Sequence, residues 1–443
     1  MQTSPAALPI ILLATLTACG ADTTGPDPIP SGPVATLAMS TPAVVVGTGL
    51  TTTLAATPKD AGGNVLTGRT ITWTSRTPAT ATVSASGVVT AGAPGTSWVV
   101  AESETIKDSS EVTVVDGQIA FAWNDNASTA GASTPEPEYS YNPTGAANTM
   151  NRTGPGLYTV GWTGLTVPSG AINAQFVTAY SPSNGGFCMD DNWGGSQLIF
   201  RCYDSAGVLA DQSSTTVVIG SGTLAGRSAF AWVDSPTTSA EASGTWRHHP
   251  LGRSIFSEHL ATGSYVVRFA GLQRASASDR EGVVVTAYGP TAAVCQSSAP
   301  TSTTTALEVA VRCFDATGAP VDSRYTILLA DRARVGASLG FALADQPTAA
   351  TYTPANSAVR GTGSVLITRA SVGVWDVAFT GFARSGTLKE SFIVSPVGTT
   401  AGRCWIEYWD YSSTAGGTGT VRVGCSTVAG VAADMPFSVV AVQ

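Results

Sequence analysis

The sequence contains little charge, few lysines and few histidines. Its 443 residues include 22 Lys and Arg and 30 Asp and Glu, which gives a formal net charge of −8. Nucleic-acid binding requires clustered basic side chains, and the lysines are only Lys59, Lys107 and Lys389. We therefore expect no nucleic-acid partner. Three histidines also leave little material for acid–base or metal chemistry at neutral pH.

Long apolar runs and helical periodicity are also missing. Beyond the first twenty residues no apolar run approaches the ~18 residues of a membrane-spanning helix. No stretch carries a sustained 3.6-residue apolar period. Apolar residues nevertheless make up 43% of the chain, and its 48 Gly and 25 Pro fall short of the level that indicates low-complexity disorder. The chain is expected to fold into two to four domains, at roughly 100–200 residues each.

The N-terminus has the pattern of an export signal. An uncharged apolar segment, residues 6–18, is too short to span a bilayer and stops at Cys19. The four residues Leu16–Cys19 resemble the lipobox of bacterial lipoproteins. The resemblance implies cleavage after a signal peptide of residues 1–18 and a diacylglycerol anchor on Cys19. The alternative is a free or buried cysteine. Gly20, in place of Asp, implies the outer membrane if the cell is Gram-negative.

Residues 19–33 are predicted to form a lipidated, extended and disordered tether. This segment is rich in Pro and Gly, and proline fixes φ and lacks the N–H that a strand ladder needs. The N-terminal features together predict an extracytoplasmic protein anchored to the cell envelope, with the membrane as its partner through the lipid on Cys19.

The seven cysteines form an odd set that the lipid anchor explains. Without Cys19, six remain in three local pairs spaced by about 110 residues: Cys188 with Cys202, Cys295 with Cys313, and Cys404 with Cys425. We expect each pair to form a disulfide, as is usual in an oxidising compartment. A disulfide that closes a loop of about 15 residues contributes about 3 kcal/mol by the chain-entropy estimate. Metal–thiolate sites are the alternative, but the CxxC spacing is missing.

The sequence around these pairs repeats at the same spacing. Residues 120–125, Ala-Phe-Ala-Trp-Asn-Asp, match residues 229–234 and, more loosely, residues 340–345. Such self-similarity identifies tandem modules. We assign repeat 1 to residues 117–224, repeat 2 to 225–334 and repeat 3 to 335–443.

Each repeat is predicted to be a β-sandwich. Tyr, Val, Trp and Phe alternate with smaller or polar residues in runs such as 157–162 and 265–269, which is the period-2 pattern of half-buried strands. Clusters of Gly, Pro, Asn and Asp separate the runs at intervals near ten residues. The fold class we predict is all-β, with tandem antiparallel Ig-like β-sandwiches.

Residues 34–116 lie outside the repeats and contain no cysteine. Thr72-Trp73-Thr74-Ser75, followed by residues 81–90 with Gly87 in a turn, resembles the group 2 bacterial immunoglobulin-like (BIG2) domain. The resemblance implies a surface module, often a spacer or an adhesive domain, with no catalytic residues. From the residues themselves, Trp73 is expected to fill the space between two sheets. Gly87 is expected to adopt a positive φ in the turn.

No catalytic set is recognisable, so we predict that the protein is not an enzyme and uses no cofactor or metal. Gly336–Gly340 fits the G-x-S-x-G nucleophile pattern around Ser338, but that pattern needs a later histidine, and all the histidines precede it. His248, His249 and His259, with Glu258, could together form a metal site. A variable surface loop explains the His248-His249 pair better.

Aromatic side chains are the best candidate ligand-binding residues. Trp405 and Trp409 lie near carboxylates in repeat 3, and so does Trp193 in repeat 1. Exposed rings beside carboxylates can stack on a sugar and hydrogen-bond to it. However, Trp193 and Trp409 occupy the same position after the first cysteine, where repeat 2 has Pro300. Packing on the disulfide is the interpretation we favour for these rings.

The leading functional hypothesis is non-catalytic adhesion or surface display, with an unknown extracellular protein or glycan as partner. The alternative is a carbohydrate-binding surface protein that uses Trp193, Trp405 and Trp409, which requires exposed rings. An enzyme of unrecognised type is the third hypothesis.

Overall fold

The computed structural model describes residues 32–48, 51–93, 95–115, 119–165, 172–182, 185–194, 196–224, 226–331, 339–359, 363–382, 390–411 and 417–442. These residues form β-strands and short 3-10 turns, which confirms the predicted all-β class. In this described part, no helix is long and apolar enough to cross a membrane. The predicted signal peptide, Cys19 and residues 20–31 of the tether lie outside it.

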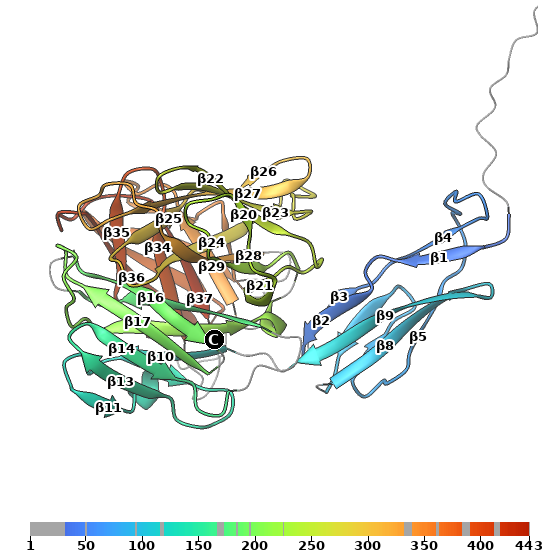
Figure 1. Cartoon of the computed structure of the whole chain (residues 1–443), viewed down its shortest axis with the longest axis horizontal. Helices are drawn as coiled ribbons and strands as arrows, with labels where there is room; N and C mark the ends of the chain where they lie inside the picture. Colours follow the sequence, from blue (N-terminus) through green and yellow to red (C-terminus); the bar gives the residue numbers. More distant parts are fainter. Residues whose placement is uncertain are drawn as a thin grey trace, which may run out of the picture.

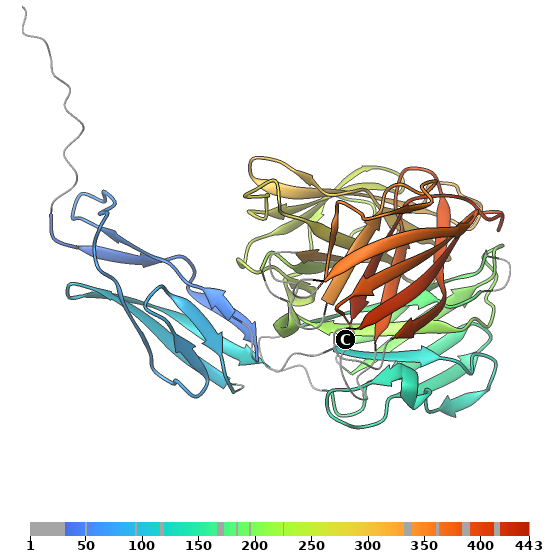
Figure 2. The same ribbon diagram turned by 180° about the vertical axis from the view of Figure 1, so that it is seen from behind.

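Strands β1 to β9 form an Ig-like domain within residues 34–116. The strands are β1 (Thr36–Met39), β2 (Ala43–Gly47), β3 (Thr51–Thr53), β4 (Ala56–Lys59), β5 (Thr72–Ser75), β6 (Ala81–Val83), β7 (Val88–Ala91), β8 (Gly95–Ser103) and β9 (Ile106–Val115). One sheet has the order β2-β9-β8-β5, a second has the order β3-β7-β6, and β1 pairs with β4. Figures 1 and 2 show this domain as a body beside the three repeats.

The predicted roles of Gly87 and Trp73 hold in this domain. Gly87 has a φ of +79°, and a Cβ there would collide with the carbonyl oxygen of Leu54. The ring of Trp73 lies over the same glycine, half-buried against the core that includes Val89 and Val99. Only glycine satisfies both the left-handed backbone and the close approach of the ring.

Each repeat is a sandwich of an inner and an outer sheet. In repeat 1 the inner sheet is β12 (Ser140–Tyr141), β10 (Ile119–Asn124), β18 (Ser214–Gly220) and β15 (Asn173–Ala179). Its outer sheet is β11 (Gly131–Ser133), β13 (Thr149–Gly154), β14 (Leu157–Gly161), β17 (Gln197–Tyr203) and β16 (Phe187–Gly194).

Repeats 2 and 3 have the same strand order as repeat 1. In repeat 2 the inner sheet is β21 (Arg247–His248), β19 (Ala229–Val233), β28 (Arg324–Asp331) and β24 (Glu281–Tyr288). Its outer sheet is β20 (Ala240–Glu241), β22 (Ile255–Ala261), β23 (Ser264–Ala270), β27 (Ala306–Phe314) and β25 (Val294–Ser297), with β26 (Thr301–Ser302) beside β27. In repeat 3 the inner sheet is β31 (Ser357–Ala358), β29 (Leu339–Ala344), β37 (Phe437–Val442) and β34 (Ser391–Pro396). Its outer sheet is β30 (Thr351–Tyr352), β32 (Ser364–Ser371), β33 (Val374–Thr380), β36 (Thr418–Thr427) and β35 (Gly402–Tyr411).

The three repeats close into a ring with pseudo-threefold symmetry. The outer sheet of each repeat meets the inner sheet of the next, in the order 1, 2, 3 and back to 1. Equivalent parallel bridges make the three junctions: Asp190 with Tyr288, Ser297 with Val397, and Ile406 with Tyr180. One backbone hydrogen bond supports each junction; for example, the N–H of Gly289 donates to the carbonyl oxygen of Asp190 at 2.8 Å. Figures 1 and 2 show the repeats as one body.

The inner sheets share a hydrophobic core around the pseudo-threefold axis. Phe176 of repeat 1, Val284 of repeat 2 and Ile393 of repeat 3 are members of this one core. The inner strands β15, β18, β37 and β34 are buried along their whole described length, because one face packs on the repeat's own outer sheet and the other on the shared core. The repeats are therefore not independent sandwiches but sectors of one body.

Candidate functional site

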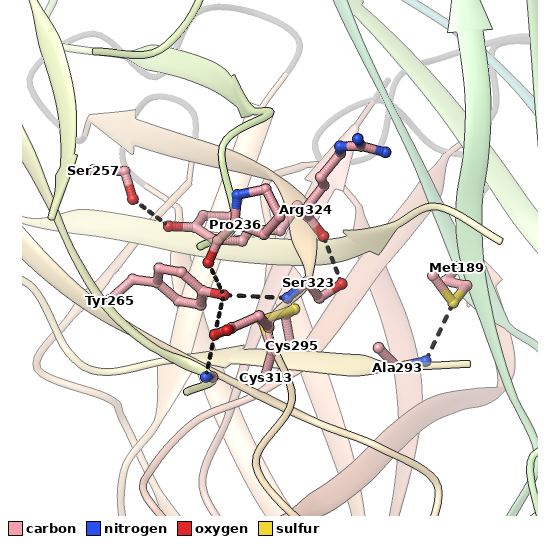
Figure 3. The surroundings of a disulfide bond; sticks show 12 residues. Met189, Pro236, Ser257, Tyr265, Ala293, Cys295, Cys313, Ser323 and Arg324 are labelled. Atoms are coloured by element: carbon pink, nitrogen blue, oxygen red, sulfur yellow. Dashed lines mark hydrogen bonds between the residues drawn. A yellow bond between two sulfur atoms is a disulfide. The ribbon is translucent and has the colours of Figure 1, made fainter. Parts of the chain in front are cut away.

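The three predicted disulfides are formed. Each joins directly opposed residues of neighbouring outer strands: Cys188 with Cys202, Cys295 with Cys313, and Cys404 with Cys425. Figure 3 shows that the repeat 2 disulfide lies close to repeat 1, since the backbone N–H of Ala293 donates to the sulfur of Met189 at 3.4 Å. The first cysteine of each pair lies on β16, β25 or β35, and each of these strands also makes a junction between repeats.

Trp409 is buried at the junction of repeats 3 and 1. Its side chain is 7% exposed. The ring centroids of Tyr180, Tyr139 and Trp123, all in repeat 1, lie 5.3, 5.4 and 6.1 Å from that of Trp409, with edge-to-face geometry. The carbohydrate hypothesis required an exposed ring here, and the structure corrects that expectation. The aromatic side chains of the next repeat cover the indole.

Trp193 is also 7% exposed, at the junction of repeats 1 and 2. Its ring lies 5.0 Å from Trp246 and 6.5 Å from Trp232 of repeat 2. It offers no open face to a sugar either, which corrects the second half of the same expectation. Trp123 and Trp232 hold the same place in the repeated Ala-Phe-Ala-Trp motif, and this repetition was the available sequence signal for two equivalent junctions.

Within the described residues, the junction of repeats 2 and 3 has no such aromatic cluster. Pro300 replaces the tryptophan there and lines a small cavity of about 10 Å³ together with Leu343 and Val397. The three junctions therefore share their backbone contacts but differ in side-chain packing.

Trp405 is the one tryptophan of the predicted set with a partly open surface. It lies half-buried on the outer face of β35, directly opposite Gly424 of β36. A Cβ at Gly424 would come within 2.6 Å of the indole atoms Cε2 and Nε1 and within 2.7 Å of a Glu407 carboxyl oxygen. The indole therefore lies flat on the sheet over a glycine.

Charged and aromatic side chains continue this surface, which we call the repeat 3 patch (Trp405, Glu407, Tyr408, Asp376 and Arg422). Tyr408 is 39% exposed, and the guanidinium of Arg422 lies 4.8 Å from the centre of its ring. Arg422 also donates two hydrogen bonds of 2.8 Å to Asp376. Burial, and secondarily Asp376, raises the pKa of Glu407, although Arg422 opposes that shift. An open ring beside hydrogen-bonding groups suits a sugar ring.

The equivalent surfaces of repeats 1 and 2 are different. The position of Trp405 is held by Met189, opposite Arg201, and by Gln296, opposite Arg312. Neither of those two repeats has a glycine under the side chain. The combination of an indole with a bare backbone beneath it belongs to repeat 3, and sequence reasoning had identified the tryptophan but not the glycine.

The histidines serve the fold of repeat 2. The Nδ1 atom of His249 accepts the backbone N–H of Leu251 at 3.1 Å, and His259 lies 2.9 Å from Asp322. Burial lowers the pKa of both His248 and His249 to about 4. Among the described residues, no three His, Cys, Asp or Glu side chains group as they would around a metal ion. Ser338 lies outside the described residues.

No protein-family model and no curated protein matches this chain. Solved structures that resemble it include domains 5–6 of the S-layer protein SbsC, which is 21% identical, covers 39% of this chain and 84% of that chain, and has a TM-score of 0.18. Domains 4 and 5 of SbsC are 15% identical, covering 54% and 92% with a TM-score of 0.20. Invasin, a bacterial integrin-binding protein, is 14% identical, covering 78% and 76% with a TM-score of 0.16.

Proposed function

We propose that this protein is a non-catalytic cell-surface lipoprotein that displays the three-repeat ring for adhesion. One observation carries the proposal: β1 lies at the end of the Ig-like domain that points away from the ring (Figure 1). An anchor N-terminal to β1 would hold the Ig-like domain next to the envelope, as a spacer, and would present the ring outward. This is the geometry that a display protein requires.

Two sequence features support the same proposal. The lipobox-like residues Leu16–Cys19 would supply the anchor, and the likeness of residues 34–116 to the BIG2 domain suits a spacer. The three disulfides suit an extracytoplasmic compartment, because cytosolic thiols are kept reduced.

A second candidate function is carbohydrate binding, and the repeat 3 patch is the observation that favours it. The indole of Trp405 lies flat on the sheet over Gly424. Arg422, two residues from Gly424 on the same face of β36, forms a hydrogen-bonded pair with Asp376 and supplies polar groups for a sugar hydroxyl. Stacking of this kind tolerates many sugars, so the patch indicates a ligand class and not one glycan.

The test compares full-length protein, with and without Trp405→Ala, on a broad glycan array and on host-cell or extracellular-matrix surfaces. Trp98→Ala is the matched control, because Trp98 is 39% exposed in the Ig-like domain, away from the patch. Glycan binding that Trp405→Ala abolishes and Trp98→Ala retains supports the carbohydrate role. Surface adhesion that survives Trp405→Ala supports adhesion through another face.

The anchor and the absence of catalysis are tested separately. Wild-type cells should incorporate labelled palmitate into the protein, and Cys19→Ala cells should not. Turnover of any substrate that a single substitution abolishes would contradict the non-catalytic assignment.

A further inference from the structure

Polar groups interrupt the apolar core on the pseudo-threefold axis. Phe176, Val284 and Ile393 form an apolar layer of the shared core, with one side chain from each repeat. The hydroxyls of Thr178, Thr286 and Ser395 lie two residues further along the same strands. They therefore lie on the same face of each sheet as the apolar layer. These three residues are buried.

The hydroxyls of this layer have protons to donate. The Oγ1 of Thr178 accepts the backbone N–H of Val394 at 3.2 Å, and the Oγ of Ser395 accepts the backbone N–H of Val285 at 3.3 Å. A hydroxyl that accepts from an amide keeps its own O–H free to donate. Both hydrogen bonds also cross from one repeat to another.

A buried cation lies beyond the hydroxyls. Arg403 is 1% exposed, and its guanidinium donates to three carbonyl oxygens: those of Gly185 and Ser205 in repeat 1, at 2.9 and 3.0 Å, and that of Ala316 in repeat 2, at 2.9 Å. The guanidinium also lies 4.6 Å from the centre of the Phe187 ring. The side chain thus ties all three repeats together at one end of the axis.

In the part of the chain that the structure describes, no carboxylate forms an ion pair with Arg403. The acceptors of its guanidinium are neutral carbonyls, and its Nε has no hydrogen-bond partner among the described residues. The carboxylate of Asp204 attracts the guanidinium only at longer range, and it accepts hydrogen bonds from the N–H groups of Ala206 and Val208 instead. Burial accordingly lowers the pKa of Arg403. A buried cation with no anion partner is costly.

A cavity of about 40 Å³ joins these groups. Its lining includes Arg403, Thr178, Thr286 and Ser395, together with the first cysteine of each disulfide. The volume exceeds the 10–15 Å³ or so that one water molecule needs. A space of this size, with hydroxyl donors on one side and an uncompensated guanidinium on another, suits a small anion.

We propose that this axial cavity binds one small monovalent anion, chloride in a chloride-containing medium, and that the anion strengthens the ring by neutralising Arg403. Unpaired buried polar atoms in native structures call for an unobserved water or ion. Water satisfies hydroxyls but leaves the charge of Arg403 without a partner, which is why the anion is favoured. The proposal does not depend on the adhesive function.

The first test locates the ion. Crystals of the full-length protein grown in sodium bromide are expected to show a bromide anomalous peak in the cavity, within hydrogen-bonding distance of Arg403 and at least one of the hydroxyls. Solvent density in the cavity without an anomalous peak would overturn the proposal.

The second test measures its effect on stability. At constant ionic strength, replacing gluconate, which is too large for the cavity, with chloride should raise the unfolding temperature of the wild type by a few degrees in a saturable way. Arg403→Val introduces the residue type that repeat 2 has at the equivalent position, Val294, and should abolish this rise. Thr178→Val should weaken it. Arg422→Gln, on the outer face, is the matched control and should retain it.

For each variant, the unfolding temperature in chloride is compared with that of the same variant in gluconate. This comparison distinguishes a general loss of stability from loss of the ion. A wild type whose unfolding temperature is the same in chloride and gluconate would refute the proposal. So would an Arg403→Val protein that keeps the full chloride response.

Discussion

The backbone N–H of Ser181 donates a hydrogen bond to the carbonyl oxygen of Ile406, 2.6 Å away. The two residues belong to repeats 1 and 3, which are not neighbours in the chain, so this contact closes the ring. The junctions of repeats 1 with 2 and of 2 with 3 carry the same hydrogen bond, from Gly289 to Asp190 and from Gly398 to Ser297. Stability should therefore belong to the whole ring more than to any one repeat.

The tryptophans at the junctions should be structural. Trp409→Ala is expected to destabilise the protein by about 3–5 kcal/mol, because it empties a site that three rings of repeat 1 surround. Trp193→Ala should lower the free energy of unfolding by a similar amount at the junction of repeats 1 and 2. Urea unfolding of the full chain, followed by far-ultraviolet circular dichroism, measures the loss.

Trp405→Ala is the control for these two variants, since Trp405 lies half-buried on the outer face. Its cost should be clearly smaller. If Trp409→Ala proved as mild as Trp405→Ala, the burial of Trp409 at the junction would be incorrect.

The glycine at the junction of repeats 1 and 2, Gly289, should be required for its backbone conformation. Gly289 has a φ of +127°, and a Cβ built there meets no atom within 4 Å. Gly289→Ala should therefore cost roughly 1–3 kcal/mol through backbone strain alone. Gly194→Ala is the matched control, because it too has open space around a Cβ but no positive φ. Thermal unfolding should separate the two variants, and equal unfolding temperatures would contradict the strain argument.

The disulfides should contribute similar amounts of stability. The three pairs are 14, 18 and 21 residues apart in sequence, and the entropy of loop closure changes slowly with length. Removing the pair Cys295 and Cys313 together by alanine substitution should lower the free energy of unfolding by about 2–4 kcal/mol. Equilibrium urea unfolding measures this change, and an unaltered urea midpoint would count against it.

The sandwich architecture could be predicted because it depends on local patterns. Outer strands such as β14 and β23 alternate buried and half-buried residues, and the sequence shows that alternation directly. The turn at Gly87 could be predicted because only glycine tolerates its φ. The cysteine pairs were recognisable because each lies within one repeat.

The ring closure depends on long-range contacts and was not predicted. The continuous apolar run of residues 327–330 within β28 (Arg324–Asp331) was an available signal for a strand buried on both faces. That pattern shows burial but does not identify the partner, which here is the other two repeats. For the same reason, the sequence could not tell which of the candidate binding residues are buried. Trp193 and Trp409 are covered by neighbouring repeats, whereas Trp405 is not, and its place depends on Gly424 of the adjoining strand.

Asp190 should make the stability of the ring pH-dependent. It is fully buried between repeats 1 and 2, and neither carboxyl oxygen has a hydrogen-bond partner among the described residues. Burial raises its pKa well above the ordinary 3.8. The unfolded chain ionises near 3.8, so the contribution of Asp190 to stability is fully present below that pH. It is lost as the pH rises through the higher folded-state pKa.

Repeat 3 has Ile406 at the position equivalent to Asp190, which supplies the test. Asp190→Ile should raise the free energy of unfolding at pH 7 by roughly 1–3 kcal/mol, because it removes unpaired buried oxygens. It should also flatten the pH dependence between pH 4 and the folded-state pKa. Asp191→Asn is the control, because the Asp191 carboxylate pairs with Arg201 at 2.8 Å on the outer face. Urea unfolding at a series of pH values decides the matter: if Asp190→Ile kept the pH slope of the wild type, the slope would come from other groups.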